Sequence, residues 1–80
     1  MALIFFGKDD NSKAGGSPAV FVDDETNELV FQGITETDPE TLAIIDRHSR
    51  TMPNESSVRV PPHLVAKIME AIDVIRARSA

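Results

Sequence analysis

The apolar positions of this chain occur in short runs separated by polar segments, a pattern typical of strands joined by turns. Residues 2–6 are continuously apolar. A strand without alternation is expected to be covered on both faces, so this run predicts either a central strand or a strand sealed by a partner. Residues 18–22 and 29–32 form two further β-rich runs around the polar segment 23–28. This spacing predicts a β-hairpin.

The segment after the hairpin carries the signals of a helix start. Asp38 can accept a hydrogen bond from the first helical turn, and Pro39 fits the first helical position. The pattern predicts a short helix that ends near His48, with Leu42 and Ile45 in its buried stripe and Ile44 as a further candidate.

The last third of the chain predicts a strand and a longer helix. Residues 57–60 alternate between polar and apolar side chains, as in a half-buried strand. Pro62 suits the first position of a final helix that runs to about Arg78. The apolar residues of this helix recur at helical spacing and predict its buried stripe: Leu64, Val65, Ile68, Met69, Ile72 and Ile75.

The order of these elements predicts an α+β fold with the pattern β-β-β-α-β-α. We expect a small antiparallel or mixed sheet of about four strands, with the long C-terminal helix packed on one face. Eighty residues correspond to one domain, residues 1–80. The segment 7–17 contains no apolar anchor and predicts a flexible loop. Gly33 follows the hairpin and indicates a bulge or a close backbone approach.

The size of the chain favours association. A domain this short buries only about 60–65% of the surface of its unfolded chain. Small domains are commonly reinforced by disulfides, metals or oligomerisation. The chain has no cysteine, which excludes disulfides, iron–sulfur clusters and thiolate zinc sites. We therefore expect a homodimer or a complex with another protein.

The net charge of −5 is unevenly distributed. Residues 1–46 hold ten acidic residues and two lysines, a balance of −8, whereas residues 47–80 hold six basic and three acidic residues, a balance of +3. Such a chain can steer a charged partner or pair head to tail with itself. The alternative function is nucleic-acid binding by the basic residues of the second half: Arg47, Arg50, Arg59, Lys67, Arg76 and Arg78. The acidic balance of the domain and the lack of a helix-turn-helix pair disfavour this alternative.

The side chains that could support catalysis or metal binding do not form a known pattern. Asp46, His48 and Ser49 are the residue types of a hydrolytic triad, but within four positions they cannot line up as nucleophile, base and orienting group. His63 and His48 are the only histidines and match no zinc-ligand spacing. Residues 23–28 alternate like a calcium loop but lack its glycine. We therefore expect a protein that is not an enzyme and holds no cofactor or metal.

The apolar runs are short compared with membrane segments. None approaches the roughly 20 residues that span a bilayer. The apolar start of the chain is too short for the core of a signal peptide and lacks a basic leader. These features predict a cytoplasmic protein.

Four short segments carry a resemblance to a known group of proteins: Val30-Phe31-Gln32-Gly33, Thr37-Asp38-Pro39-Glu40-Thr41-Leu42, Ser17-Pro18-Ala19-Val20-Phe21-Val22 and Val58-Arg59-Val60-Pro61. In these segments the chain resembles small actinobacterial proteins whose genes commonly lie beside helix-turn-helix transcription regulators, in developmental and antibiotic-control loci. The similarity covers roughly residues 17–70 in the same order. Members often carry an aromatic residue where this chain has Ile34. The resemblance implies an accessory partner or antagonist of a DNA-binding regulator.

The sequence therefore predicts a non-enzymatic regulatory protein-interaction module, with a homodimer and a helix-turn-helix regulator as expected partners. Its apolar first strand and its final helix are the expected contact surfaces. The candidate interface residues are Leu3, Phe5, Leu64, Ile68, Ile72 and Ile75.

Overall fold

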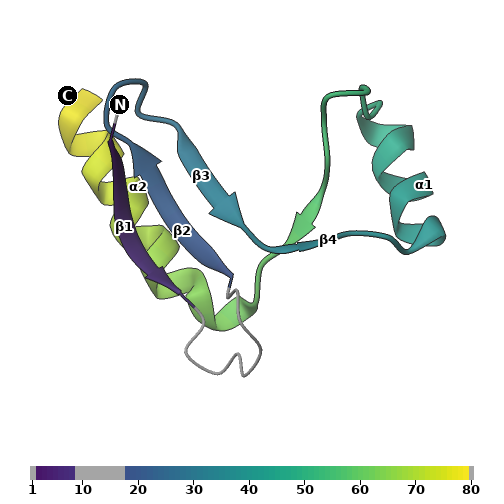
Figure 1. Cartoon of the computed structure of the whole chain (residues 1–80), viewed down its shortest axis with the longest axis horizontal. Helices are drawn as coiled ribbons and strands as arrows, with labels where there is room; N and C mark the ends of the chain where they lie inside the picture. The colour runs from purple at the N-terminus through teal and green to yellow at the C-terminus, as the bar shows by residue number, and fades with distance from the viewer. Residues whose placement is uncertain (1, 9–17, 80) are drawn as a thin grey trace.

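A computed structural model of the chain describes residues 2–8 and 18–79 and has an α+β fold (Figure 1). The sequence-based fold class is confirmed, with two small sheets in place of one sheet of about four strands. The elements in chain order are β1 (Leu3–Lys8), β2 (Ala19–Asp23), β3 (Leu29–Gln32), β4 (Ile34–Thr35), α1 (Pro39–His48), β5 (Val58–Arg59), the 3-10 turn η1 (Pro62–Leu64) and α2 (Val65–Ser79).

The predicted hairpin is confirmed, since β2 pairs antiparallel with β3 from Ala19↔Gln32 to Val22↔Leu29. Its turn is stabilised by Asp23, whose Oδ1 accepts hydrogen bonds from the backbone N–H groups of Glu25 and Thr26 at 2.9 and 3.2 Å. Asn27 adopts the left-handed conformation with a φ of 63°, which asparagine tolerates better than most residues. Local side-chain chemistry therefore fixes the turn.

Strand β1 pairs antiparallel with β2 and lies at the edge of the three-stranded sheet β1-β2-β3. The expectation of a central strand is wrong. A register shift between Phe5 and Gly7 inserts Phe6 as an extra residue, and Phe6 packs against the core. Continuous apolar sequence here reflects this bulge and an apolar outer face. The predicted loop at 7–17 begins later, because Gly7 and Lys8 belong to β1; residues 9–17 lie outside the described residues.

The long C-terminal helix α2 packs across one face of this sheet, against β1 and β2 (Figure 1). Its start is set by η1, where the backbone N–H of Leu64 donates to the carbonyl of Pro61 at 3.1 Å. The core between helix and sheet is small. Its buried residues are Val20, Val22, Leu64 and Ala71, with Phe6, Leu29, Val60, Ile68 and Ile75 packed around them.

The buried stripe of α2 is narrower than the sequence predicts. Ala71 is fully buried, and its small side chain brings the helix close to the sheet. Val65 and Met69 are more than half exposed, so their assignment to the buried stripe is wrong. These two residues are one helical turn apart and form an apolar flank beside the core.

The remaining elements form an arm, residues 34–59, that projects away from the sheet (Figure 1). At its base β4 pairs antiparallel with β5 through Ile34↔Arg59 and Thr35↔Val58. The predicted close approach at Gly33 is confirmed, because a Cβ atom there would overlap the carbonyl oxygen of Arg59. Helix α1 forms the far end of the arm and, as predicted, is capped by Asp38 and ends at His48. Its predicted buried stripe is wrong: Leu42 and Ile45 are only half-buried, and Ile44 is exposed.

Candidate protein interface

One face of the three-stranded sheet carries apolar side chains and is uncovered by any described element. Because Val20 and Val22 face α2, their cross-strand partners do so too, and the alternate positions point the other way. We call this surface the open face. It consists of Leu3, Phe5, Phe21 and Val30.

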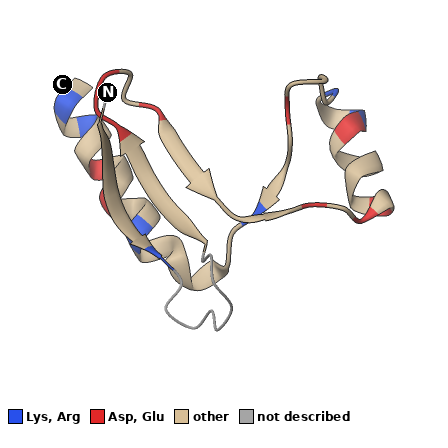
Figure 2. Ribbon diagram, viewed as in Figure 1, with Lys and Arg blue, Asp and Glu red and all other residues tan. Residues whose placement is uncertain are grey.

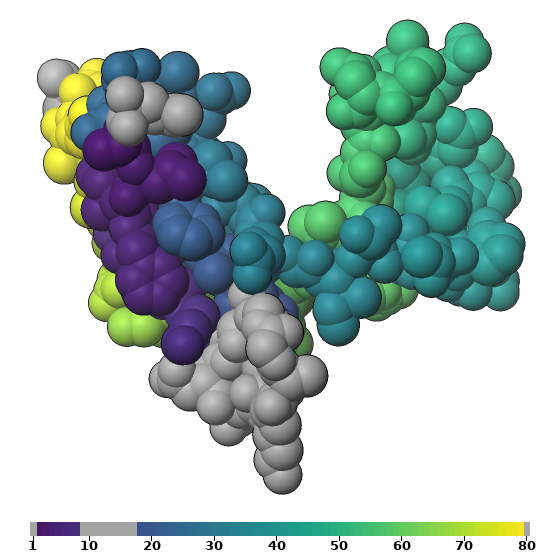
Figure 3. Space-filling model, viewed as in Figure 1, coloured from purple at the N-terminus to yellow at the C-terminus, as the bar shows by residue number. Residues whose placement is uncertain are grey.

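The side chains of the open face are exposed, and two of its aromatic rings pack against each other. Phe5 is 56% exposed, and Leu3 and Val30 are also exposed. The rings of Phe5 and Phe21 lie 5.6 Å apart between centroids at an interplanar angle of 49°, a favourable tilted geometry. Figure 3 shows side chains of β1 and β2 at the surface of the sheet on the viewer's side. An apolar sheet face of this kind is a candidate contact surface.

An acidic turn borders the open face. Leu3 pairs with Asp23, so the face ends at the 23–28 turn. There the Asp24 backbone N–H donates to the carbonyl of Ala2, and the Asp24 Oδ1 accepts from the N–H of Ala2, both at 3.0 Å. Glu25 and Glu28 are exposed. The turn therefore places fixed negative charge beside the apolar residues.

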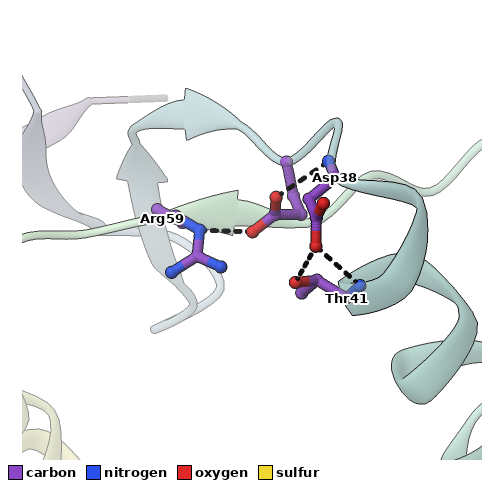
Figure 4. Close-up of polar contacts among 4 residues, drawn as sticks. Asp38, Thr41 and Arg59 are labelled. Carbon is purple, nitrogen blue, oxygen red and sulfur yellow. Dashed lines mark hydrogen bonds and ion pairs between the residues drawn. The ribbon is translucent and has the colours of Figure 1, made fainter.

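A chain of polar contacts holds α1 on the base of the arm (Figure 4). The guanidinium of Arg59 on β5 donates to the carboxylate of Glu36, whose side chain is buried. The other oxygen of Glu36 accepts from the backbone N–H of Asp38 at 3.1 Å. Asp38 in turn accepts from the Thr41 hydroxyl at 2.7 Å and from the Thr41 N–H at 3.0 Å. These contacts fix the direction in which α1 leaves the paired strands β4 and β5.

The electrostatics of this network are visible at Asp38. The hydrogen bonds from the side chain and backbone of Thr41, with a smaller contribution from the charge of Arg59, lower the pKa of Asp38 below its ordinary value of 3.8. Each contact stabilises the charged carboxylate more than its protonated form. The cap is therefore ionised at neutral pH.

The six candidate interface residues lie in three different environments: the open face, the core and the flank of α2. Leu3 and Phe5 lie on the open face and remain candidates. Leu64 is only 2% exposed, and Ile68 and Ile75 pack against the buried cluster, so these three belong to the core. The assignment of Leu64 to an interface is corrected on that ground. Ile72 is half-buried on the flank that carries Val65 and Met69.

Sequence reasoning missed Phe21 and Val30 as members of the open face. The alternation within each strand was visible in the sequence. The register was not: Phe21 pairs with Phe5 in a strand pair that contains the bulge at Phe6, and it pairs with Val30 through the β2–β3 hairpin. Of the four phenylalanines, Phe5 and Phe21 pair on this face, whereas Phe6 packs against the core and Phe31 pairs with the core residue Val20.

The basic residues proposed as nucleic-acid contacts do not gather on one surface (Figure 2). Arg47 and Arg50 lie at the far end of the arm, Arg59 at its base and the others along α2. Arg59 is paired with Glu36, and Arg78 donates to the carbonyl of Asp24. Lys67 lies 3.8 Å from the carboxylate of Glu70. A continuous groove for a phosphate backbone is not formed by these six side chains.

Asp46 and Ser49, two of the three residues with the side chains of a hydrolytic triad, form hydrogen bonds at the C-terminal end of α1. The Ser49 backbone N–H donates to the carbonyl of Ile45 at 2.8 Å, and Asp46 accepts from the N–H of Thr51 at 3.0 Å. An open hollow of about 290 Å³ lies beside them. Its lining combines one apolar, one acidic and one basic residue with hydroxyl groups: Ile45, Ser49, Arg50, Thr51, Glu55, Ser56 and Ser57. This lining offers hydrogen bonds but includes neither Asp46 nor His48.

Residues 2–8 and 18–79 hold no cluster of three or more side chains suited to a metal ion. Over the same residues, no helix has the length and apolar character needed to cross a membrane.

Comparison with known proteins adds no identification: no family model, curated protein or solved structure matches the chain.

Proposed function

We propose that this chain is a non-enzymatic regulatory protein-interaction module that binds a DNA-binding transcription regulator in the cytoplasm through the open face. The observation that carries the proposal is the exposed apolar cluster of Leu3, Phe5 and Val30 on an edge strand and its neighbours. Aromatic residues contribute strongly to protein interfaces when a partner buries them. The tilted Phe5–Phe21 pair supplies such an anchor.

Charge favours a basic partner. Asp24, Glu25 and Glu28 border the open face, and the chain as a whole carries a net charge of −5. A DNA-binding surface is basic, so contact with it would be attractive at long range and would weaken with added salt. Occupation of that surface would compete with DNA, which makes antagonism the expected mode. The sequence resemblance to proteins encoded beside helix-turn-helix regulators supports the same class of partner.

The test is a binding titration between the purified chain and a helix-turn-helix regulator encoded next to its gene. We expect binding that weakens with salt and a loss of regulator–DNA complex as the chain is added. Phe5→Glu should weaken binding by about tenfold or more, because it places a charge at the centre of the apolar contact. Val58→Glu is the matched control, since Val58 is similarly exposed but lies on the arm.

Two results would contradict the proposal. One is the absence of binding to the regulator at low salt. The other is equal binding by the parent chain and Phe5→Glu, with Phe5→Glu still folded by circular dichroism.

A further inference from the structure

A second apolar surface lies on the side of the sheet that faces the arm. The flanks of α2 can be assigned from contacts: Lys67 approaches Gly7 of β1, and Arg78 contacts Asp24 beside the start of β1. Val65 and Met69 lie on the opposite flank of the helix, and in the sheet order β1-β2-β3 that flank is the β3 side. Figure 1 shows β3 as the strand nearest the arm.

Two residues extend this flank toward the arm. Phe31 of β3 lies on the α2 side of the sheet, since it pairs with Val20, and it remains exposed. Ile34, the first residue of the arm, is 73% exposed. We call the surface formed by Phe31, Ile34, Val65 and Met69 the cleft face. An apolar hollow of about 240 Å³ continues it at the junction, lined by Pro18, Ile34, Arg59, Val60, Pro61 and Pro62.

The arm has unburied apolar residues of its own. Helix α1 contains no buried residue, although it has an apolar side. Ile44 of α1, Met52 of the return segment and Val58 of β5 are all exposed. Isolated helices of ten residues are marginal in water, and packing of an apolar face normally supplies their stability. The arm therefore lacks the contact that a helix of this length needs.

The chain exposes more area than a compact monomer of its size. A compact monomer of 8.7 kDa is expected to expose about 4,700 Å², whereas this chain exposes 6016 Å². The excess of roughly 1,300 Å² exceeds the approximately 800 Å² per partner of a standard stable interface. The radius of gyration of 14.2 Å also exceeds the roughly 12 Å expected for 80 compact residues.

The base of the arm opposes closure onto its own sheet. The backbone approach of Gly33 to Arg59 and the Glu36–Arg59 ion pair hold β4 to β5 at the base of the arm. The Pro61–Pro62 sequence restricts the backbone that joins this base to α2. Figure 3 shows open space between the sheet and the arm. The space is thus available to a segment that enters from outside the chain.

We propose that the chain forms a homodimer by exchange of arms, in which α1 of each copy packs against the cleft face of the other. Ile44 of α1 is then buried against Val65 and Met69. Charge favours antiparallel helices, because the first turn of α1 carries Glu40 and the last turn of α2 carries Arg76 on the same flank as Val65 and Met69. The cleft face is distinct from the open face, so this inference does not depend on the regulator proposal.

Cross-linking between two single-cysteine variants tests this arrangement, and the natural absence of cysteine makes it specific. Ile44→Cys and Met69→Cys are mixed in equal amounts and treated with a short bis-maleimide. We expect a cross-linked dimer that contains one chain of each kind, identified by mass spectrometry. In the matched control, Glu70→Cys replaces Met69→Cys. Glu70 is the next residue along α2, but the helical rotation of about 100° per residue turns it away from the cleft face. The yield of cross-linked dimer should therefore be much lower with Glu70→Cys.

Three outcomes would overturn the exchange. The first is a chain that sediments as a monomer at all concentrations up to several hundred micromolar. The second is equal cross-linking of Met69→Cys and Glu70→Cys with Ile44→Cys. The third is efficient cross-linking within one chain when Ile44→Cys and Met69→Cys are combined, which would show that the arm closes on its own sheet.

Substitutions on the two faces separate this inference from the proposed function. Met69→Glu should weaken self-association by about tenfold or more, since it would bury a charge in the interface, while the exposed position tolerates it in the monomer. Leu3→Glu should leave self-association unchanged and weaken regulator binding. A dimer unaffected by Met69→Glu would contradict arm exchange, whatever the regulator binds.

Discussion

Asp38 shows how one side chain fixes the start of a helix. Its carboxylate accepts both hydrogen bonds that Thr41 offers, and Pro39 has no N–H that needs a partner. Glu36 accepts hydrogen bonds from both the Arg59 guanidinium and the Asp38 backbone N–H. The residue that caps α1 is therefore connected to the β4–β5 strand pair at the base of the arm. The cap therefore positions the helix as well as starting it.

This cap makes α1 sensitive to acid. Because the folded-state pKa of Asp38 is lowered below 3.8, its contribution to stability is complete above the ordinary value and is lost as the pH falls through the folded value. We expect the Thr41 amide resonance and the helical shifts of α1 to titrate below pH 3.8. Asp38→Asn should cap the helix without this titration, and Asp38→Ala should reduce helicity at every pH. An identical acid response in the parent and Asp38→Asn would contradict this assignment.

Gly33 is required by space rather than by conformation. A Cβ atom there would meet the backbone carbonyl of Arg59, which cannot move without displacing the β4–β5 ladder. Gly33→Ala should lower the free energy of unfolding by about 1–3 kcal/mol. Gly7→Ala is the comparison, because the nearest atoms there belong to the side chain of Lys67, which can shift more readily than a backbone carbonyl in a paired strand. Chemical denaturation of both variants measures the difference, and equal losses would refute this explanation.

At the scale of elements, neighbouring residues of the last helical segment have opposite roles. Leu64 is 2% exposed in the core, whereas Val65 is 54% exposed on the flank. Leu64→Ala should lower the free energy of unfolding by about 2–5 kcal/mol, and Val65→Ala should change it by less than about 0.5 kcal/mol in the monomer. Urea denaturation at low protein concentration measures both. A large loss for Val65→Ala in the monomer would contradict the assigned orientation of α2.

The elements whose signals are local were predictable from the sequence. The Asp38–Pro39 start of α1, the hairpin around residues 23–28 and the amphipathic character of the last helix were each predicted by neighbouring residues. The position of β1 at the sheet edge was not, because a continuous apolar run fits a central strand and an edge strand with an apolar outer face equally well.

The candidate interface was predicted only in part for a related reason. Hydrophobic periodicity places Leu64 and Val65 on the same broad stripe, but the buried Ala71 sets which line of the helix touches the sheet. The open face needs the register of three strands, including the bulge at Phe6. Both depend on contacts between segments distant in the sequence, which a local pattern does not specify.

At the scale of the whole molecule, stability is concentrated in one part of the chain. The buried cluster lies entirely between the sheet and α2, while α1 has no buried residue. Local unfolding of the arm therefore exposes little additional apolar surface and should require much less free energy than global unfolding. Packing of α1 against a second copy would remove this difference, so the arm should report association directly.

Hydrogen exchange at two protein concentrations measures this coupling. In a dilute monomer, the amides of α1 should exchange far faster than those of β2, whose neighbours on both sides pair with it. At concentrations that favour the dimer, the amides of α1 should gain protection while those of β2 change little, because only the arm acquires a new contact. In Met69→Glu the arm should stay unprotected at both concentrations, which serves as the control for the cleft face. Protection of α1 equal to that of β2 in the dilute monomer would mean that the arm is stable without a partner. The structure would then give no reason for two copies to exchange their arms.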